Sequence, residues 1–482
     1  MGTQGPPAIG RMGRRRALQL AAAGAAAYTL SACAPTGGRA AAGSTPAAAP
    51  AGTTVPFQLY VVSIPVNATS TKLIQDFVDQ TFNAQHKGVR AVFQAAGNMA
   101  GIAADVLAGK AAPVVVSSCC SDWVTILPLL AQLDPWLKQG NVDPAMWTAG
   151  QLSRFQTPTG LFGLPEDAAS EAYLYRQDIL DSLGLEYPAP TWTSVDAAAL
   201  WASCTGTVSG RHRYGTQLPW ESTASCGGGL VGFPAMVQGW SGGAFMSSDG
   251  TRCLLDQPGS IAAGEYFFDL TWSQIAAPGT CGSPTPMIFT GQAVFAQGAE
   301  PTILEAVQQL GSKAKWDFVP YPRFPARPVG VLHDNFYGML ASAPDPELAW
   351  ELLQFAAIDP DWSRFYMQLS LSPPSLPSLL EEWTTILQTV APVLRGKYLQ
   401  AWTDPTMNGD GLYDFEFFKY SANNANALVS ATWPKIWNQQ LDVTAGFQTI
   451  AQQVNALETT SAATAANAPA SGTAARGGTT AG

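Results

Sequence analysis

The stretch FQLYVVSI, residues 57–64, decides the fold class, because it opens a regular alternation of strands and helices. Its apolar run is typical of a buried strand. The segment STKLIQDFVDQTFNAQH, residues 70–86, has the apolar spacing of a helix, with Ser70 as the expected cap. Two more predicted strands, VRAVFQA at 89–95 and PVVVSSC at 113–119, flank a short helical segment. The alternation predicts an α/β domain with a largely parallel sheet.

Helical patterns dominate after Asp178. The clearest are PTWTSVDAAALWASC at 190–204 and PELAWELLQFAAID at 346–359, and KWDFVPYP at 315–322 predicts a late strand. The chain has 482 residues and no internal repeat, so its length suggests two or three domains of about 150 residues each.

The two ends of the chain have a different character from the middle. Three arginines at 14–16 precede an alanine-rich apolar run that ends in Leu-Ser-Ala-Cys at Cys33. This pattern predicts a signal peptide over 1–33 of the twin-arginine type, and its end resembles the lipobox of bacterial lipoproteins. The alternative is an ordinary signal peptide with a chance cysteine; the run is too short for a convincing membrane span. We expect a flexible tether over 34–55 and a disordered tail over 459–482, since neither has the apolar side chains to pack.

The composition limits the ligand and the cofactors. The formal net charge is −10 and charged residues make up 12%, which disfavours nucleic acid as a partner and favours a neutral ligand. Most of the 15 tryptophans are expected in the core. With three histidines and no C-x-x-C spacing, we expect no metal and no other cofactor.

Six cysteines remain when Cys33 is set aside, and outside the membrane an even number favours disulfides. Proximity in sequence suggests Cys204 with Cys226 and Cys253 with Cys281 as candidates. The adjacent Cys119 and Cys120 form either a strained bridge or two thiols. Connectivity does not follow from the sequence.

Six blocks of the chain, taken in order, resemble the bacterial extracellular solute-binding proteins of the sugar-binding ABC-transporter class, family 1. A strand-to-helix block, a P-x-TW helix entry and a Gly-Gly turn come first, and a G-x-A-x-F block, a late helix and a G-x-x-P hinge follow. They are GLPEDAASEAYLYRQDIL (163–180), LGLEYPAPTWTSVDAAA (183–199), FPAMVQGWSGGAFMSSDG (233–250), FTGQAVFAQGAEPTI (289–303), PDPELAWELLQFAAIDPDWSRF (344–365) and LSLSPPSL (369–376).

The sequence departs from the family pattern at three places. The usual Tyr-Asn-Lys-Asp run is Tyr-Arg-Gln-Asp at 175–178, and Ala299-Glu300 replaces a family tryptophan. Ser375 stands where the hinge block has an arginine. These departures concern the identity of the ligand more than the fold.

The resemblance implies a two-lobed, periplasmic-binding-protein-like α/β fold of type II, with a hinge and a ligand cleft between the lobes. Crossings are expected near Pro165, Pro320 and 369–373. Lobe one would contain 56–165 and 320–370, and lobe two would contain 166–319 and 371–458. The resemblance further implies a monomeric, non-enzymatic receptor. It would be lipid-anchored on the extracytoplasmic face of the bacterial membrane, and it would pass a saccharide or polyol to an ABC-transporter permease.

Polar and aromatic residues near strand ends and glycine turns are the candidate ligand contacts. Trp123 follows a strand, where open α/β sheets bind ligands, and Trp240 precedes the flexible Gly242-Gly243 pair. Acidic and polar residues near the crossings would accept or donate hydrogen bonds to hydroxyls. The predicted set is Asp122, Trp123, Asp167, Trp220, Trp240, Glu300, His333, Asn335 and Tyr337.

Three other interpretations compete with a receptor. GWSGG matches the G-x-S-x-G nucleophile elbow, with Ser241 as nucleophile of a secreted hydrolase, although the expected strand before it is interrupted by Pro234. Adjacent carboxylates at 166–167 or 381–382 suggest a glycosidase, but neighbours in sequence do not flank a bond. A sensing or adhesion lipoprotein would keep the fold and transport nothing.

Overall fold

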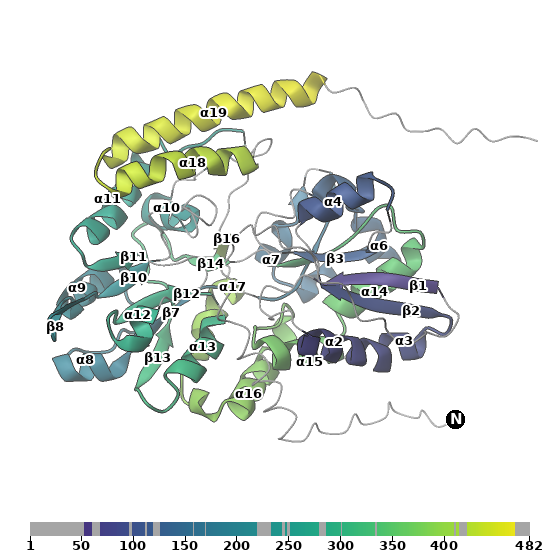
Figure 1. The fold of residues 1–482 in the computed structure, drawn as a ribbon, viewed down its shortest axis with the longest axis horizontal. Coiled ribbons are helices and arrows are strands. Elements are labelled where there is room, and N and C mark those ends of the chain that lie inside the picture. Colours follow the sequence, from purple (N-terminus) through teal and green to yellow (C-terminus); the bar gives the residue numbers. More distant parts are fainter. Residues whose placement is uncertain are drawn as a thin grey trace, which may run out of the picture.

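The computed structural model describes residues 53–59, 68–95, 99–110, 113–118, 126–157, 159–168, 170–218, 233–242, 246–247, 251–278, 286–299, 301–332, 335–408, 411–413 and 422–467. Two α/β lobes lie side by side, and several segments cross between them (Figure 1).

Lobe one is built on a five-stranded sheet in the order β2-β1-β3-β15-β6. The strands are β1 (Thr53–Leu59), β2 (Val89–Ala95), β3 (Val115–Ser118), β6 (Leu164–Pro165) and β15 (Phe336–Met339). β1 pairs in parallel with β2 and β3, whereas β15 is antiparallel to β3 and β6. The late strand β15 therefore joins a sheet begun almost 300 positions earlier, so lobe one is made of separated parts of the chain.

Helices with well-defined starts cover this sheet. α2 (Ala68–Gln80) packs on β2, and α14 (Pro346–Ala357) packs on β3 and β15. α14 begins at Asp345, whose carboxylate accepts the Leu348 N–H at 3.1 Å, and proline follows at the first helical position. α15 (Pro360–Ser370) repeats this arrangement with Asp359 as its cap. The smaller helices α3 (Phe82–Gln85), α4 (Met99–Leu107), α6 (Asp134–Gln139) and α7 (Ala149–Ser153) complete the lobe.

Lobe two is built on the sheet β12-β7-β13. β7 (Ala172–Arg176) is its centre, antiparallel to β12 (Phe295–Gly298) and β13 (Trp316–Val319). The parallel pair β10 (Thr216–Leu218) and β11 (Ala276–Pro278) extends it, because the backbone of 214–215 bonds to 294–295. Side chains on opposite faces of β7 enter two different hydrophobic cores, with Leu174 in one and Tyr175 in the other.

One group of helices surrounds the lobe-two sheet. A second group follows the last segment that crosses between the lobes. They are α8 (Gln177–Leu183), α9 (Ser194–Cys204), α10 (Phe233–Ser241), α11 (Pro258–Trp272), α12 (Pro286–Thr290) and α13 (Pro301–Gln309), and then α16 (Leu380–Val390), α17 (Asp404–Met407), α18 (Ala422–Trp437) and α19 (Val443–Asn467). α18 and α19 pack together, and α19 lies on α11 at the outer side of lobe two (Figure 1).

Several predicted boundaries differ from the structure. The first strand begins at Thr53, inside the predicted tether, and residues 60–67 lie outside the described part. Ser70 lies inside α2 rather than at its cap. α19 continues to Asn467, into the predicted disordered tail, where alanines at 462–463 and 465–466 favour a helix.

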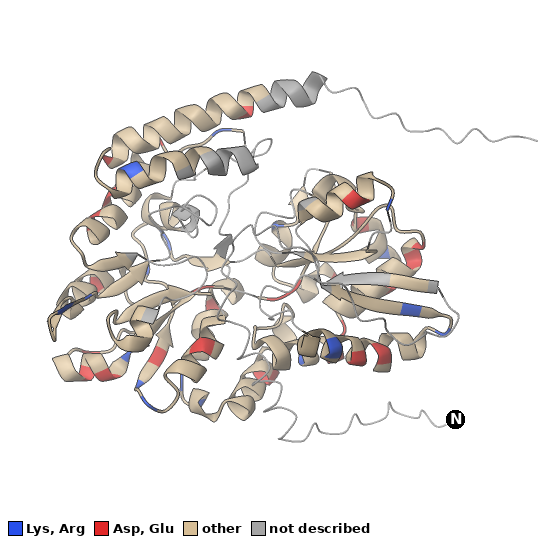
Figure 2. Cartoon of the chain, viewed as in Figure 1, with Lys and Arg blue, Asp and Glu red and all other residues tan. Residues whose placement is uncertain are grey.

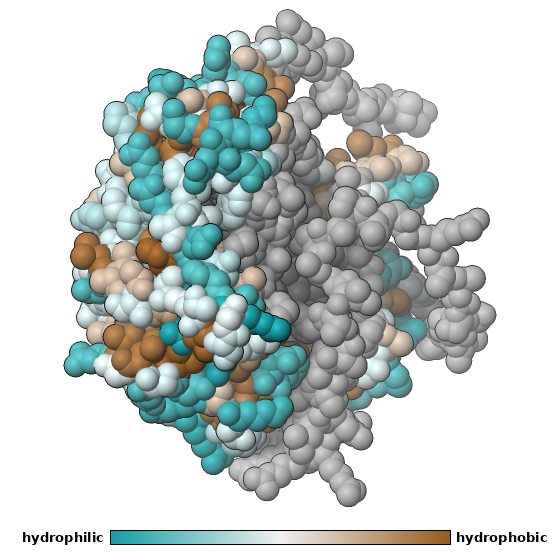
Figure 3. All heavy atoms as spheres, turned by 60° about the vertical axis from the view of Figure 1, so that its left-hand side comes forward, coloured by the Kyte–Doolittle hydropathy of each residue, from teal (hydrophilic) through white to brown (hydrophobic). Residues whose placement is uncertain are grey.

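Charged residues are sparse along the described chain in both lobes (Figure 2). On the lobe-two side, apolar patches alternate with polar ones (Figure 3). Exposed large apolar side chains of the described chain include Val195 on α9 and Val208. In the described part of the chain, no helix has both the length and the apolar character needed to cross a membrane.

Candidate functional site

Three segments cross between the lobes and lie beside one another. The first joins β6 to β7, and the second joins the lobe-two core to β15. The third follows α15 at Leu371. The backbone of the first crossing bonds to both others, because Glu166 N–H donates to Asn335 O at 3.0 Å and Ala168 N–H donates to Pro373 O at 3.1 Å. The crossings therefore form one hydrogen-bonded unit.

The second crossing lies later in the chain than the predicted position at Pro320. Tyr321, Phe324 and Val331 all pack in the second, lobe-two core, and the chain reaches the lobe-one sheet only at Phe336. Residues 320–332, which we assigned to lobe one, thus pack with lobe two. The proline-rich sequence after β13 suggested a boundary, but its aromatic side chains return to the same core.

Lobe one holds the start of the first crossing through Glu166, which is buried. The Tyr366 hydroxyl on α15 donates to Oε1 at 2.8 Å, and the Ser117 hydroxyl on β3 donates to Oε2. Burial, and then the charges of Glu166 and Asp167, raise the pKa of Tyr366 well above its ordinary value of 10.0. Tyr366 therefore remains a neutral donor, and Glu166 is fixed to the lobe-one framework.

Lobe two holds the other end of the same crossing. The Glu171 side chain is fully buried, and its Oε2 accepts the Tyr321 hydroxyl at 2.7 Å and the Gln297 amide. The Ser170 hydroxyl donates to the Trp402 carbonyl. Carboxylates at the two ends of one segment are thus bound by opposite lobes, as expected where a chain transmits relative motion between two bodies.

Asp167, between these two ends, joins the first crossing to the second. The Asn335 amide donates to both of its carboxylate oxygens, at 3.1 and 3.0 Å. Asp167 and Asn335 are 4% and 5% exposed, so the structure brings together two residues of the predicted ligand set in a buried position. The backbone of Asp167 also bridges Pro374 of the third crossing.

Replacing Asn335 with alanine should destabilise the fold by about 1–3 kcal/mol, because a buried carboxylate then loses two hydrogen bonds. Urea unfolding would measure this loss. Asn408→Ala, at an exposed position, is the matched control and should change stability by less than about 0.5 kcal/mol. Equal unfolding midpoints for the two variants would show that the Asp167–Asn335 contact does not stabilise the crossings.

The third crossing begins with a residue in an unusual backbone conformation. Leu371 has φ +61°, in the left-handed region, and is not a glycine. Its carbonyl accepts the Trp383 indole N–H at 2.9 Å, and its side chain is buried. Such a conformation costs about 1–2 kcal/mol for a non-glycine residue and is retained here by its surroundings.

Of two further predicted ligand residues, one is buried and the other is half-buried. Tyr337 is 1% exposed, and its hydroxyl accepts the Trp362 indole N–H at 3.3 Å. It is a core residue in this conformation. Trp240 lies near the end of α10, half-buried against Tyr266 with ring centroids 4.4 Å apart, so part of its surface remains accessible.

The other predicted ligand residues lie outside the described part of the chain: Asp122, Trp123, Trp220, Glu300 and His333. The same holds for Cys33, Cys119, Cys120, Cys226 and Cys281. Their roles remain predictions.

Cys204 is buried at the end of α9 and forms no disulfide with a described residue, and its predicted partner Cys226 lies outside the described part, so that pairing stays a prediction. Burial raises the pKa of the Cys204 thiol to about 11, which disfavours the reactive thiolate. Cys253 is also buried, and its backbone N–H donates to Asn455 at 2.7 Å. The Cys204 side chain packs in the lobe-two core.

The hydrolase motif has the wrong structural context. Ser241 ends helix α10, and its hydroxyl donates to Val237 O at 2.9 Å, as in an ordinary helical turn. A nucleophile elbow needs a strand directly before the serine. The glycosidase alternative fails at 166–167, where both carboxylates are buried in structural hydrogen bonds. Among the described residues, no group of three or more His, Cys, Asp and Glu could hold a metal ion.

Sequence reasoning missed several residues that hold the crossings: Ser117, Glu166, Gln297, Tyr321 and Tyr366. From the sequence alone, Glu166 is a candidate only as a glycosidase carboxylate. Its partners lie 49 and 200 positions away, so no local pattern indicates them.

Comparison with known proteins agrees with this architecture. A family model described as bacterial extracellular solute-binding protein matches residues 67–358. No curated protein matches the sequence. Similar solved structures include an ABC substrate-binding protein from Listeria monocytogenes in complex with cycloalternan, at 16% identity and TM-score 0.67, covering 84% of this chain and 99% of that one.

Two more structures are similar to the same extent. The cyclic alpha-maltosyl-1,6-maltose binding protein from Arthrobacter globiformis has 15% identity and TM-score 0.66, over 85% of this chain and 100% of that one. The sugar-binding protein MalE from Xanthomonas citri has 16% identity and TM-score 0.66, over 86% and 100%. These likenesses confirm the predicted two-lobed α/β fold of type II.

Proposed function

Because the chain belongs to the family of bacterial extracellular solute-binding proteins, we propose that it captures a carbohydrate or polyol outside the cytoplasmic membrane. It would then deliver this ligand to an ABC-transporter permease without chemical conversion. The observation that carries the proposal is the shared fold, over most of the chain, with proteins described as binding sugars. The low charge of the chain, 12%, favours a neutral ligand over an ionic one.

A sugar receptor of this architecture needs both polar groups and aromatic surface. Each ligand hydroxyl removed from water must find a hydrogen-bond partner, or affinity is lost. An aromatic side chain that covers about 100 Å² of apolar sugar and ring surface contributes roughly 2.5 kcal/mol. In the described part, the half-buried Trp240 is the tryptophan that we propose for such a contact.

A saccharide that binds between the lobes should raise the melting temperature, because it binds only the folded protein. A thermal-shift screen of oligosaccharides and polyols, followed by calorimetry, tests this. Trp240→Ala should weaken binding by about 2 kcal/mol, or roughly thirtyfold, if the indole stacks on the sugar.

Tyr187→Ala is the matched control for this variant, since it removes an exposed aromatic side chain elsewhere in lobe two. It should leave the affinity unchanged. A broad screen without any thermal shift would argue strongly against a sugar receptor. Consumption of the bound saccharide would instead indicate an enzyme.

We also propose that Cys33 carries lipid and anchors the mature protein. Two acyl chains hold a protein stably on a membrane, because each buried CH₂ contributes about 0.8 kcal/mol. Cys33→Ala should therefore move the protein from the membrane fraction to the soluble fraction. Cys253→Ala is the control that should stay with the membrane. Intact mass spectrometry showing an uncut, unmodified N-terminus would contradict the anchor.

A sensing or adhesion lipoprotein remains the second candidate, since it would share the binding step. The two differ in their partner. Stimulation of a permease ATPase by the loaded protein supports transport, and saccharide binding without such stimulation supports sensing.

A further inference from the structure

Three parallel strands of lobe two end at the edge of the sheet that the first crossing enters. β10 runs parallel to β11, and the Tyr214–Ala293 bridge makes it parallel to β12 as well. β12 is antiparallel to β7, so its last residue, Gly298, pairs with Ala172, the first residue of β7. Ala172 directly follows Glu171 of the first crossing. The carboxyl ends of β10, β11 and β12 therefore lie beside a crossing, and such an edge is where open α/β sheets bind ligands.

Gln217, one residue before the end of β10, is buried at this edge without a hydrogen-bond partner. Its side chain is 1% exposed, and neither Nε2 nor Oε1 has a partner. Among the described residues, it is the one side chain with two such atoms. Reversing the amide supplies no partner, because both of its ends lack one. A buried, unpaired amide costs free energy, so this side chain lowers the stability of the ligand-free protein.

Gln297 occupies the equivalent position on the neighbouring strand, one residue before the end of β12, and its amide is fully paired. Its side chain is 2% exposed. Nε2 donates to Glu171, and Oε1 accepts the Tyr173 hydroxyl at 3.4 Å. Two glutamines with the same burial at the same edge thus differ in their partners. Burial at this edge alone does not leave an amide unpaired, and the unpaired atoms of Gln217 need another explanation.

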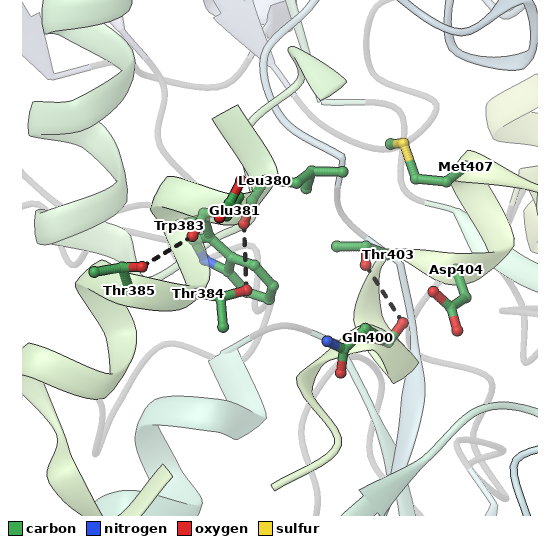
Figure 4. Close-up of a pocket in the computed structure, with 9 residues that line it drawn as sticks. All are labelled: Leu380, Glu381, Trp383, Thr384, Thr385, Gln400, Thr403, Asp404 and Met407. Carbon is green, nitrogen blue, oxygen red and sulfur yellow. Dashed lines mark hydrogen bonds between the residues drawn. The ribbon is translucent and has the colours of Figure 1, made fainter. Parts of the chain in front are cut away.

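The pocket between α16 and the segment formed by η7 (Leu399–Trp402) and α17 contrasts with Gln217 (Figure 4). Its volume is about 420 Å³. The hydroxyls of Thr384 and Thr385 donate to backbone carbonyls of their own helix, at 3.2 and 3.1 Å. The Asp404 carboxylate accepts the Tyr398 hydroxyl at 2.7 Å. These polar groups already have partners in the protein, so the pocket indicates a ligand less strongly than the Gln217 amide does.

An unpaired primary amide selects the chemical group that satisfies it. It presents N–H donors and an acceptor oxygen side by side. A carboxylate only accepts and an ammonium group only donates, whereas two neighbouring hydroxyls do both. We propose that Gln217 binds two neighbouring hydroxyls of the saccharide, one donating to Oε1 and the other accepting from Nε2. This inference rests on the proposed function and assigns a residue that determines which sugars are bound.

The Gln217 side chain has to become accessible for this contact. Since it is 1% exposed, the groups that cover it must move, and a change in the relative orientation of the lobes is a movement of this kind. The saccharide then supplies the partners that the protein does not. Gln217 thus lowers the stability of the free protein and raises its affinity, a trade-off typical of functional residues.

The first test needs no saccharide. Gln217→Met replaces the amide with an apolar side chain of similar length, so the urea midpoint of the full-length protein should rise. Gln297→Met is the matched control, and its midpoint should fall because Glu171 and Tyr173 each lose a partner. A lower midpoint in both variants would show that the Gln217 amide is paired in the free protein and would overturn the proposal.

The second test measures affinity by calorimetry. The probes are the neutral trisaccharides maltotriose, cellotriose, mannotriose and xylotriose, together with any saccharide that the thermal-shift screen identifies. Gln217→Met should weaken binding of the tightest of these at least about tenfold. Gln452→Met, an exposed change on α19, should leave its affinity unchanged. The side-chain amide NMR signals of Gln217, assigned with the methionine variant, should shift when the saccharide binds.

Monodeoxy analogues of the bound saccharide separate a contact from a structural role. Loss of either contacted hydroxyl should weaken binding to wild type at least about tenfold and change binding to Gln217→Met little. Equal losses in both proteins, or an unchanged affinity of Gln217→Met for the saccharide, would overturn the role of Gln217 and leave the receptor intact. A screen in which no saccharide binds would overturn the receptor itself and this role with it, so the two failures are distinguishable.

Discussion

Glu305→Gln is expected to stabilise the protein above neutral pH by up to about 3 kcal/mol and to have little effect near pH 4. Glu305 lies on α13, and its Oε2 atom is buried without a hydrogen-bond partner anywhere in the described part of the chain. Burial raises the pKa of this carboxyl from 4.5 to about 7. The ionised form is therefore disfavoured in the folded state.

The sign of the pH dependence follows from this direction. Below pH 4.5 the carboxyl is protonated in both the folded and the unfolded states and contributes no difference. Between about 4.5 and 7 the unfolded chain releases its proton first, so the free energy of unfolding falls as the pH rises. Above about 7 the loss is complete, at about 1.4 kcal/mol per pKa unit. A glutamine has no proton to release and lacks this loss.

Urea unfolding of wild type and variant at pH 4 and pH 8 would measure the difference. Glu265→Gln is the matched control. The Glu265 side chain is exposed, so this change should have the same effect on stability at pH 4 and at pH 8. Parallel pH profiles for Glu305→Gln and wild type would show that the carboxyl is solvated. An NMR titration of Glu305 gives its pKa directly and separates ionisation from packing effects of the amide.

Local sequence patterns predict the helices and strands, because each pattern lies within the residues of the element that it predicts. The strand predicted at 89–95 coincides with β2, and the helix predicted from Pro346 coincides with the start of α14. Both depend on apolar periodicity and, for α14, on an Asp-Pro start. Such features are properties of a few consecutive residues.

The hinge was only partly predictable, because its contacts join distant parts of the chain. The sequence indicated Asp167 and Asn335 as polar residues near the crossings, and the structure brings them together. It could not indicate that Tyr321 returns to Glu171, since these residues are 150 positions apart. For the same reason the second crossing was placed too early, at a proline that looked like a boundary.

Trp316→Ala should lower the free energy of unfolding by about 3–5 kcal/mol, the usual cost of truncating a large core side chain. The Trp316 side chain on β13 is fully buried, and its indole N–H donates to Gly311 O at 2.9 Å. The ammonium group of Lys397 lies 3.9 Å from its ring centroid, and Phe318 meets it edge-on at 5.4 Å. Truncation would leave a cavity, an unpaired carbonyl and a half-buried lysine without its aromatic partner.

Trp316→Ala should be compared with Trp240→Ala, because Trp316 is a core residue and Trp240 is the proposed ligand contact. We expect Trp316→Ala to unfold at a much lower urea concentration while the folded fraction keeps its saccharide affinity. Trp240→Ala should show the reverse, with a smaller loss of stability and a large loss of affinity. Trp316→Phe retains most of the apolar volume and should recover more than half of the lost stability. If both alanine variants lose affinity in proportion to stability, the indole of Trp240 belongs to the core, and the sugar-stacking surface lies on another residue.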